Sequence, residues 1–199
     1  MLEFLTGSGL ASAAGLNAYL PLLIVGLLDR YTDIIKLPHS WEWLSNPWVL
    51  GLLAGLLLIE IVADKVPVID NVNDVIQTAI RPTSGGIVFG ASAGAETTAI
   101  NTPSDFFDDY AWVGVLSGVL IALAVHIAKS VLRPVINVMT VGVGAPIVST
   151  IEDGVSAILS FVALLIPLLI LFFFGGFIVL VIALLRKRKP PAQQIVYKM

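Results

Sequence analysis

Residues 155–185 read VSAILSFVALLIPLLILFFFGGFIVLVIALL and contain no charged side chain. A helix that crosses a membrane needs about 20 consecutive, mainly apolar residues. At 1.5 Å per residue this stretch would be about 46 Å long, which exceeds a hydrocarbon core of roughly 30 Å. We therefore expect a membrane helix that is kinked at Pro167 or at Gly175-Gly176, or that projects from the bilayer at one end. Ser149 and Glu152, just before this stretch, have the spacing of a capping box that opens the helix.

The rest of the chain has a similar character. Of its 199 residues 57% are hydrophobic and only 13% are charged, whereas soluble domains carry about 25% charged residues. Most of the surface is therefore expected to contact lipid. The chain has no cysteine, which excludes disulfides, thiolate metal sites and thiol nucleophiles.

Further apolar segments precede the C-terminal stretch. Together with it they predict an all-α, polytopic transmembrane bundle of about six membrane segments, some of them short, kinked or re-entrant. Asn17 and Pro21 interrupt the first segment, and Gly142, Gly144 and Pro146 interrupt the fifth. We expect a single transmembrane domain over residues 1–185 and a basic tail over residues 186–199. The five additional segments are 4–28, 48–63, 83–95, 111–128 and 134–150.

Between the second and third segments lies a polar stretch, residues 66–81, whose apolar positions recur at helical spacing. This pattern predicts an amphipathic helix at the membrane interface or against the bundle. In the third segment Gly86, Gly90 and Gly94 are four residues apart and share one helix face. Membrane helices use such faces for close packing, either within the chain or in a homo-oligomer.

The charged residues predict the orientation in the bilayer. Basic residues crowd the tail from Arg186 to Lys189, which should be cytoplasmic by the positive-inside rule. The acidic loop 96–109 has no basic residue and should lie outside, as should residues 150–154. Six segments then leave both termini in the cytoplasm. An acidic body with a basic tail also argues against nucleic-acid binding.

Charged residues occur within or at the edge of the predicted membrane segments. Such residues are costly unless paired or hydrated, and they mark functional sites by default. Glu60 and Asp64 lie one turn apart on the second segment, and we expect them to face Lys129, with His126 as a further partner, on the fourth. The alternative interpretation is that these charges only lock two helices together or reach to the interface. The candidate ion or solute pathway comprises Asn17, Glu60, Asp64, Lys65, His126, Lys129 and Arg133.

A second polar face carries Asp70, Asp74 and Arg81. Carboxylates one turn apart suit a divalent metal, as in prenyl-diphosphate enzymes, and an arginine suits a phosphate. Those enzymes also need a second acidic motif, which the sequence lacks. The alternative is the solvated face of an interfacial helix. No other cofactor and no catalytic residue is expected.

Residues 60–70 read EIVADKVPVID, and the pattern continues through Asp74 to Arg81-Pro82 and Gly85. This run, with residues 15–19 upstream, resembles a family of small bacterial membrane proteins catalogued only as a domain of unknown function, numbered four-one-two-six. The resemblance implies the same architecture in a bacterial inner membrane. It supplies no activity.

Three functions fit these observations. The first is a small transporter or channel for an ion or small solute, with the lipid bilayer as its surroundings. The second is a membrane-embedded enzyme acting on a lipid or isoprenoid phosphate, and the third is a structural or assembly protein. We expect transport rather than a reaction. A hydrated site at Glu60 would favour transport, a metal beside Asp70 and Asp74 an enzyme, and a dry, fully paired cluster a structural role.

Overall fold

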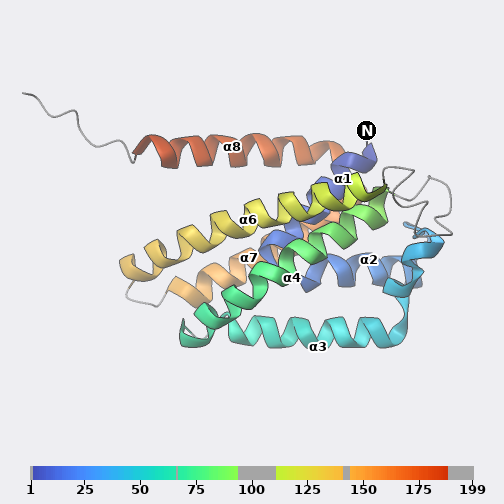
Figure 1. Cartoon of the computed structure of the whole chain (residues 1–199), viewed down its shortest axis with the longest axis horizontal. Helices are drawn as coiled ribbons and strands as arrows, with labels where there is room; N and C mark the ends of the chain where they lie inside the picture. Colours follow the sequence, from blue (N-terminus) through green and yellow to red (C-terminus); the bar gives the residue numbers. More distant parts are fainter. Residues whose placement is uncertain (1, 66, 94–110, 141–143, 188–199) are drawn as a thin grey trace, which may run out of the picture.

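The computed structural model describes residues 2–65, 67–93, 111–140 and 144–187. Within these ranges it is helical and has no strand, which confirms the all-α bundle (Figure 1). The long helices run side by side and differ in direction. The elements are α1 (Leu2–Leu16), α2 (Tyr19–Tyr31), the 3-10 helix η1 (His39–Ser45), α3 (Pro47–Ala63), α4 (Pro67–Ala93), α6 (Ala111–Met139), α7 (Gly144–Leu165), the 3-10 turn η2 (Pro167–Leu169) and α8 (Ile170–Lys187).

Helix α1 forms the centre of the bundle. Every residue from Gly7 to Gly15 is buried, and α4, α6 and α7 pack around the helix. Its small side chains allow this close packing. A Cβ atom at Gly15, for example, would lie 2.7 Å from the carbonyl oxygen of Ala122 on α6.

The first predicted segment folds back on itself at Asn17. The side-chain oxygen of Asn17 accepts hydrogen bonds from the backbone amides of Tyr19 (3.1 Å) and Leu20 (3.0 Å), which lets a new helix start in a new direction. Helix α2 then returns toward the end of the bundle where α1 begins (Figure 1). Glu3 near the start of α1 and Lys36 after α2 line one cavity there. The predicted interruption at Asn17 is present, and α1 and α2 form a helical hairpin about it instead of one continuous helix.

The sequence predicted two separate elements here, an interfacial helix (66–81) and a third membrane segment (83–95). The structure has a single helix, α4, in their place. It is one continuous helix with Pro82 inside it. Gln77 is 2% exposed and Arg81 is fully buried. The polar face therefore turns into the bundle rather than toward the bilayer surface.

The predicted segment 134–150 does not exist as an element. Helix α6 continues through Pro134 to Met139, and α7 begins at Gly144, whose amide donates to the Thr140 hydroxyl at 3.0 Å. Residues 150–154 consequently lie inside α7 and not in an outer loop, and Glu152 is not part of a cap. The predicted break at Pro167 is present, but it is a reversal and not a kink within one long helix. The 3-10 turn beginning there separates α7 from α8, and the two helices run in opposite directions (Figure 1).

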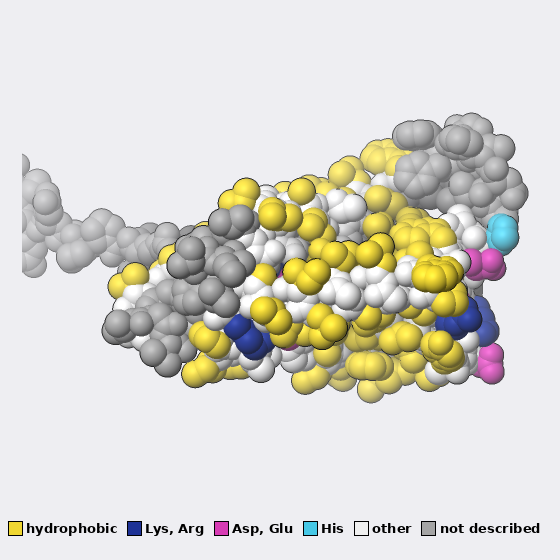
Figure 2. Space-filling model, turned by 90° about the horizontal axis from the view of Figure 1, so that it is seen from below, with side chains coloured by type: hydrophobic (Ala, Val, Ile, Leu, Met, Phe, Trp, Pro, Cys, Tyr) yellow, Lys and Arg dark blue, Asp and Glu magenta, His cyan; other side chains and the backbone are white. Residues whose placement is uncertain are grey.

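Several described helices are suited to a membrane. Residues 112–136 of α6 and 146–165 of α7 are long and apolar enough to cross one, and the bent pair of η1 and α3 would make a third span. Figure 2 shows apolar side chains over most of one face of the molecule, with charged groups gathered toward its ends. These helices indicate a membrane protein.

Candidate functional site

Six charged side chains from four helices meet next to the tip of the α1–α2 hairpin, residues 16–18. We call them the charge cluster. Their side chains are only 0% to 13% exposed. The charge cluster consists of Glu60 and Asp64 on α3, Arg81 on α4, Lys129 and Arg133 on α6, and Glu152 on α7.

Glu60 is paired with Arg81 on α4. Nη2 of Arg81 is 3.0 Å from its Oε1 atom and 3.7 Å from Oδ2 of Asp64. One guanidinium group thus lies against two carboxylates that are one turn apart on α3. Arg81, which the sequence suggested for a phosphate site, is the cationic partner of Glu60.

Asp64 lies at the centre of the cluster. Its Oδ2 atom is 3.0 Å from Nη2 of Arg133 and 3.5 Å from Nζ of Lys129. Its other oxygen accepts a hydrogen bond from the Asn73 side chain at 2.7 Å. The expected contact between Asp64 and Lys129 is therefore present.

Lys129 connects the cluster to the hairpin tip. Its ammonium group donates to the Leu16 carbonyl at 3.0 Å and lies 2.9 Å from Oε2 of Glu152. The last carbonyls of a helix have no partner within that helix, so the end of α1 makes the Leu16 carbonyl available. Arg133 binds the same Glu152 oxygen at 2.7 Å.

Glu152 and its neighbour Asp153 are the acidic groups that sequence reasoning missed. Asn17 at the hairpin tip donates its side-chain amide to Oδ1 of Asp153 at 2.9 Å. The distribution of basic residues had placed both acids in an outer loop, residues 150–154. The signal that could have found them is their position between two apolar stretches.

His126 contacts the cluster through Arg81 and not through a carboxylate. Nη1 of Arg81 is 3.1 Å from His126 Nδ1, and the Thr78 hydroxyl is 3.0 Å from Nε2. Arginine only donates hydrogen bonds, so Nδ1 must accept and the ring hydrogen is on Nε2. His126 is therefore neutral in this arrangement.

The remaining polar candidates lie outside the cluster. Lys65 donates to the carbonyl of Ile61 on its own helix at 3.1 Å. Asp74 lies 3.9 Å from Arg133 and is 19% exposed, and the side chain of Asp70 is outside the described residues. Within the described part of the chain, no three His, Asp or Glu side chains are grouped to hold a metal ion.

Gly86 and Gly90 face α6. A Cβ atom at Gly86 would lie 2.8 Å from Val119, and one at Gly90 would lie 2.8 Å from Val115. The nearby Gly85 is closest to the α6 backbone. This glycine face is thus occupied within the chain, while Gly94 lies outside the described residues.

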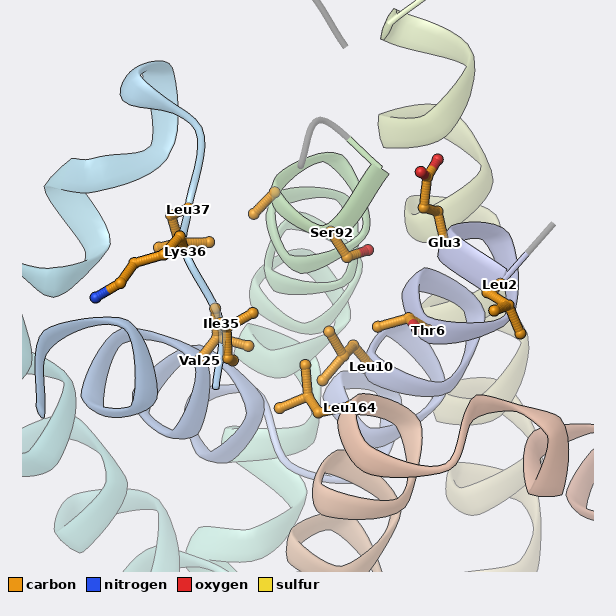
Figure 3. Close-up of a pocket in the computed structure, with 11 residues that line it drawn as sticks. Leu2, Glu3, Thr6, Leu10, Val25, Ile35, Lys36, Leu37, Ser92 and Leu164 are labelled. Atoms are coloured by element: carbon orange, nitrogen blue, oxygen red, sulfur yellow. The ribbon is translucent and has the colours of Figure 1, made fainter. Parts of the chain in front are cut away.

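At the opposite end of α1 is a mainly apolar cavity of about 210 Å³. Figure 3 shows Thr6, Leu10, Ser92 and Leu164 around it, with the side chain of Lys36 turned away. Its lining includes no member of the charge cluster.

The family described as a domain of unknown function, DUF4126, matches residues 4–187. The chain belongs to this family. The matched range includes both halves of the hairpin and every residue of the charge cluster. No curated protein and no solved structure shows a significant match to the chain. Membership of DUF4126 confirms the resemblance of residues 60–85 but assigns no activity.

Proposed function

We propose that this membrane protein moves an ion or a small solute across the bilayer along a path that includes the charge cluster and the hairpin tip. The observation that carries the proposal is the hydrogen bond from Lys129 to the Leu16 carbonyl, at the broken end of α1. Non-helical backbone at membrane depth is tolerated only where it is buried in protein or lines a cavity. Broken helices with free carbonyls are also where transporters coordinate ions.

The energetic cost of the cluster supports a functional role. Replacing a buried ion cluster by apolar side chains of similar volume is often neutral, or stabilising by about 1–4 kcal/mol. The fold alone therefore does not require six buried charges. Ionisable groups inside membrane bundles mark ion and proton pathways by default.

The charge balance of the cluster gives a basis for coupling. As defined, the cluster has three carboxylates and three cations, and Asp74 lies 3.9 Å from Arg133 at its edge. An arriving cation or proton changes the net charge in a low-dielectric environment, where charges interact strongly. The contacts that cross from α3 and α7 to α6 would then have to rearrange.

A structural role is the second candidate. Asp64 and Arg133 each contact several partners, and the cavity shown in Figure 3 is at the other end of the bundle. A dry network of this kind would lock α3, α6 and α7 together. We propose that transport takes place in a bacterial inner membrane, with the basic tail in the cytoplasm. The experiment below distinguishes transport from the structural role.

The test is ion flux through the full chain reconstituted in liposomes, with protons, Na⁺, K⁺ and Cl⁻ as probes. We expect flux of at least one of these ions above that of protein-free liposomes, and a decrease of about tenfold or more in Asp64→Asn. Glu42→Gln is the matched control, since the Glu42 side chain is 56% exposed on η1. Absence of flux for all four ions, with Asp64→Asn only lowering thermal stability, would favour the structural role.

A further inference from the structure

Three buried polar atoms next to one another in the fold have no hydrogen-bond partner within the described structure. They are Oε2 of Glu60, Oε1 of Gln77 and Nε of Arg81. The three residues are 2%, 2% and 0% exposed, respectively. An unpaired buried polar group costs about 1–3 kcal/mol, and about 90% or more of such groups in proteins are paired. Their unpaired state is the observation from which a bound ligand is inferred below.

The three side chains converge from two helices. Gln77 lies one turn before Arg81 on α4, so their side chains share a face of the helix. Arg81 binds Oε1 of Glu60, which places the other oxygen of the same carboxylate close to the guanidinium. Tyr19, the first residue of α2, interacts with all three of these side chains. Tyr19 of the hairpin, Glu60 of α3 and the two side chains of α4 thus lie near one another inside the bundle.

The unpaired atoms define the chemistry of the ligand. Two of them accept hydrogen bonds and one donates. The matching ligand donates two hydrogen bonds and accepts one, and water does so. Buried waters typically make about three such bonds to otherwise unsatisfied groups.

We propose that Glu60, Gln77 and Arg81 bind an internal water and that Glu60 exchanges a proton with it, so that the proton is the ion that this protein carries or couples to. The choice of ion rests on the proposed transport function, whereas the water and proton site does not.

Glu60 is suited to this exchange more than the other carboxylates of the cluster. Asp64 accepts hydrogen bonds at both oxygens, and Glu152 is held by two cations. Glu60 has one oxygen on Arg81 and one that is open. The groups that face it are Arg81 from α4, Asp64 from its own helix, Lys129 from α6 and Tyr19 from α2.

The proton step balances without a further reactant. A proton from the water bonds to Oε2 of Glu60, which becomes a neutral carboxylic acid, and the water regains a proton from the aqueous side. Arg81 keeps a carboxylate partner during this step, since Asp64 lies 3.7 Å from it. The new hydroxyl group supplies a donor for the site's acceptors. Release of the proton reverses these steps.

Infrared difference spectroscopy of the full chain in lipid tests this site. The sample is acidified from about pH 9 to about pH 4, a range that covers ordinary and raised pKa values of carboxyl groups. We expect a carboxylic C=O band that is lost in Glu60→Gln and retained in Glu42→Gln. Gln77→Leu removes an acceptor and should shift the band without removing it. These variants are compared by thermal unfolding. If Glu60→Gln does not fold, Glu60→Asp replaces it; this variant keeps a carboxyl group, so the band should shift in frequency instead of disappearing, and an unshifted band would overturn the proton site.

The outcomes separate the two proposals. A band that persists in Glu60→Gln, or the same spectrum in all variants, overturns the proton site. Flux of another ion in liposomes without a Glu60 band leaves the transport function standing and overturns the inference. A Glu60 band without any ion flux supports the proton site and contradicts transport.

Discussion

Lys129 shows how much a single residue depends on its partners in this protein. Its ammonium group contacts Glu152 at 2.9 Å, the Leu16 carbonyl at 3.0 Å and Asp64 at 3.5 Å. Removing one member of a buried ion pair typically costs about 3–5 kcal/mol, because it leaves an uncompensated charge. We expect Lys129→Ala to lose stability of that order in thermal or denaturant unfolding in detergent.

A second substitution identifies the partner. Adding Glu152→Gln to Lys129→Ala removes the uncompensated charge and should restore part of the lost stability. Glu60→Gln should restore less, because Glu60 contacts Arg81. Equal rescue by both would mean that the pairing described here is wrong.

At this scale, the sequence predicted part of the site. The helical spacing of Glu60, Asp64, Lys129 and Arg133 was enough to expect them near one another, because buried charges require opposite charges nearby. The spacing could not show that Arg81 joins them, since a polar stretch with its own apolar face also fits an interfacial helix. Only the packing of α4 along α1 turns that polar face inward.

Among the elements, the α1–α2 hairpin positions the site. We expect Asn17→Ala to lose more stability than Asn46→Ala. Asn17 accepts hydrogen bonds from the first amides of α2, as Asn46, the N-cap of α3, does from Trp48, and loss of such a bond costs about 0.5–2 kcal/mol. Asn17 also donates a hydrogen bond to the partly buried Asp153. Equal losses in unfolding experiments would show that the bond to Asp153 contributes nothing.

The contact between α4 and α6 depends on the absence of side chains. A Cβ atom at Gly85 would lie 2.7 Å from the Gly118 carbonyl oxygen, whereas one at Gly51 would have nothing within 4 Å. Gly85→Leu should therefore destabilise the protein by about 1–3 kcal/mol or more through overpacking. Gly51→Leu is the control and should leave the midpoint of thermal unfolding unchanged or raise it. Similar midpoints for both variants would exclude a tight α4–α6 contact.

The sequence predicted an interruption at Asn17 but not its consequence. A kinked helix and a helical hairpin have the same composition and the same polar residue at the break. What distinguishes them is a pair of tertiary and capping contacts that the sequence does not show. The Asn17 side chain accepts a hydrogen bond from an amide at the start of α2, and Lys129 donates one to the carbonyl at the end of α1. Similarly, α6 ends at Met139, and the Thr140 hydroxyl accepts a hydrogen bond from the first amide of α7, in a stretch whose glycines suggested a broken segment.

For the whole molecule, the hairpin changes the expected orientation of the N-terminus. In Figure 1 the start of α1 and the end of α8 lie at opposite ends of the bundle. If the basic tail is cytoplasmic, the start of α1 is outside. The chain has no cysteine, so single cysteines can be introduced at Leu2, Glu42 and Met139.

A membrane-impermeant maleimide should label Leu2→Cys and Glu42→Cys in intact cells, and Met139→Cys only after permeabilisation. Leu2 and Met139 are 55% and 79% exposed, respectively, so both sites can react. Labelling of Leu2→Cys only after permeabilisation would mean that the first segment crosses the membrane. The earlier expectation of two cytoplasmic termini would then hold.

The most direct test of the account is proton flux driven by a membrane potential into liposomes that contain the full chain, followed with an internal pH-sensitive dye. We predict that the wild type and Glu42→Gln acidify the interior faster than protein-free liposomes do, and that Glu60→Gln slows this acidification by about tenfold or more. Wild-type acidification no faster than that of protein-free liposomes, or equal rates in the wild type and Glu60→Gln, would contradict it.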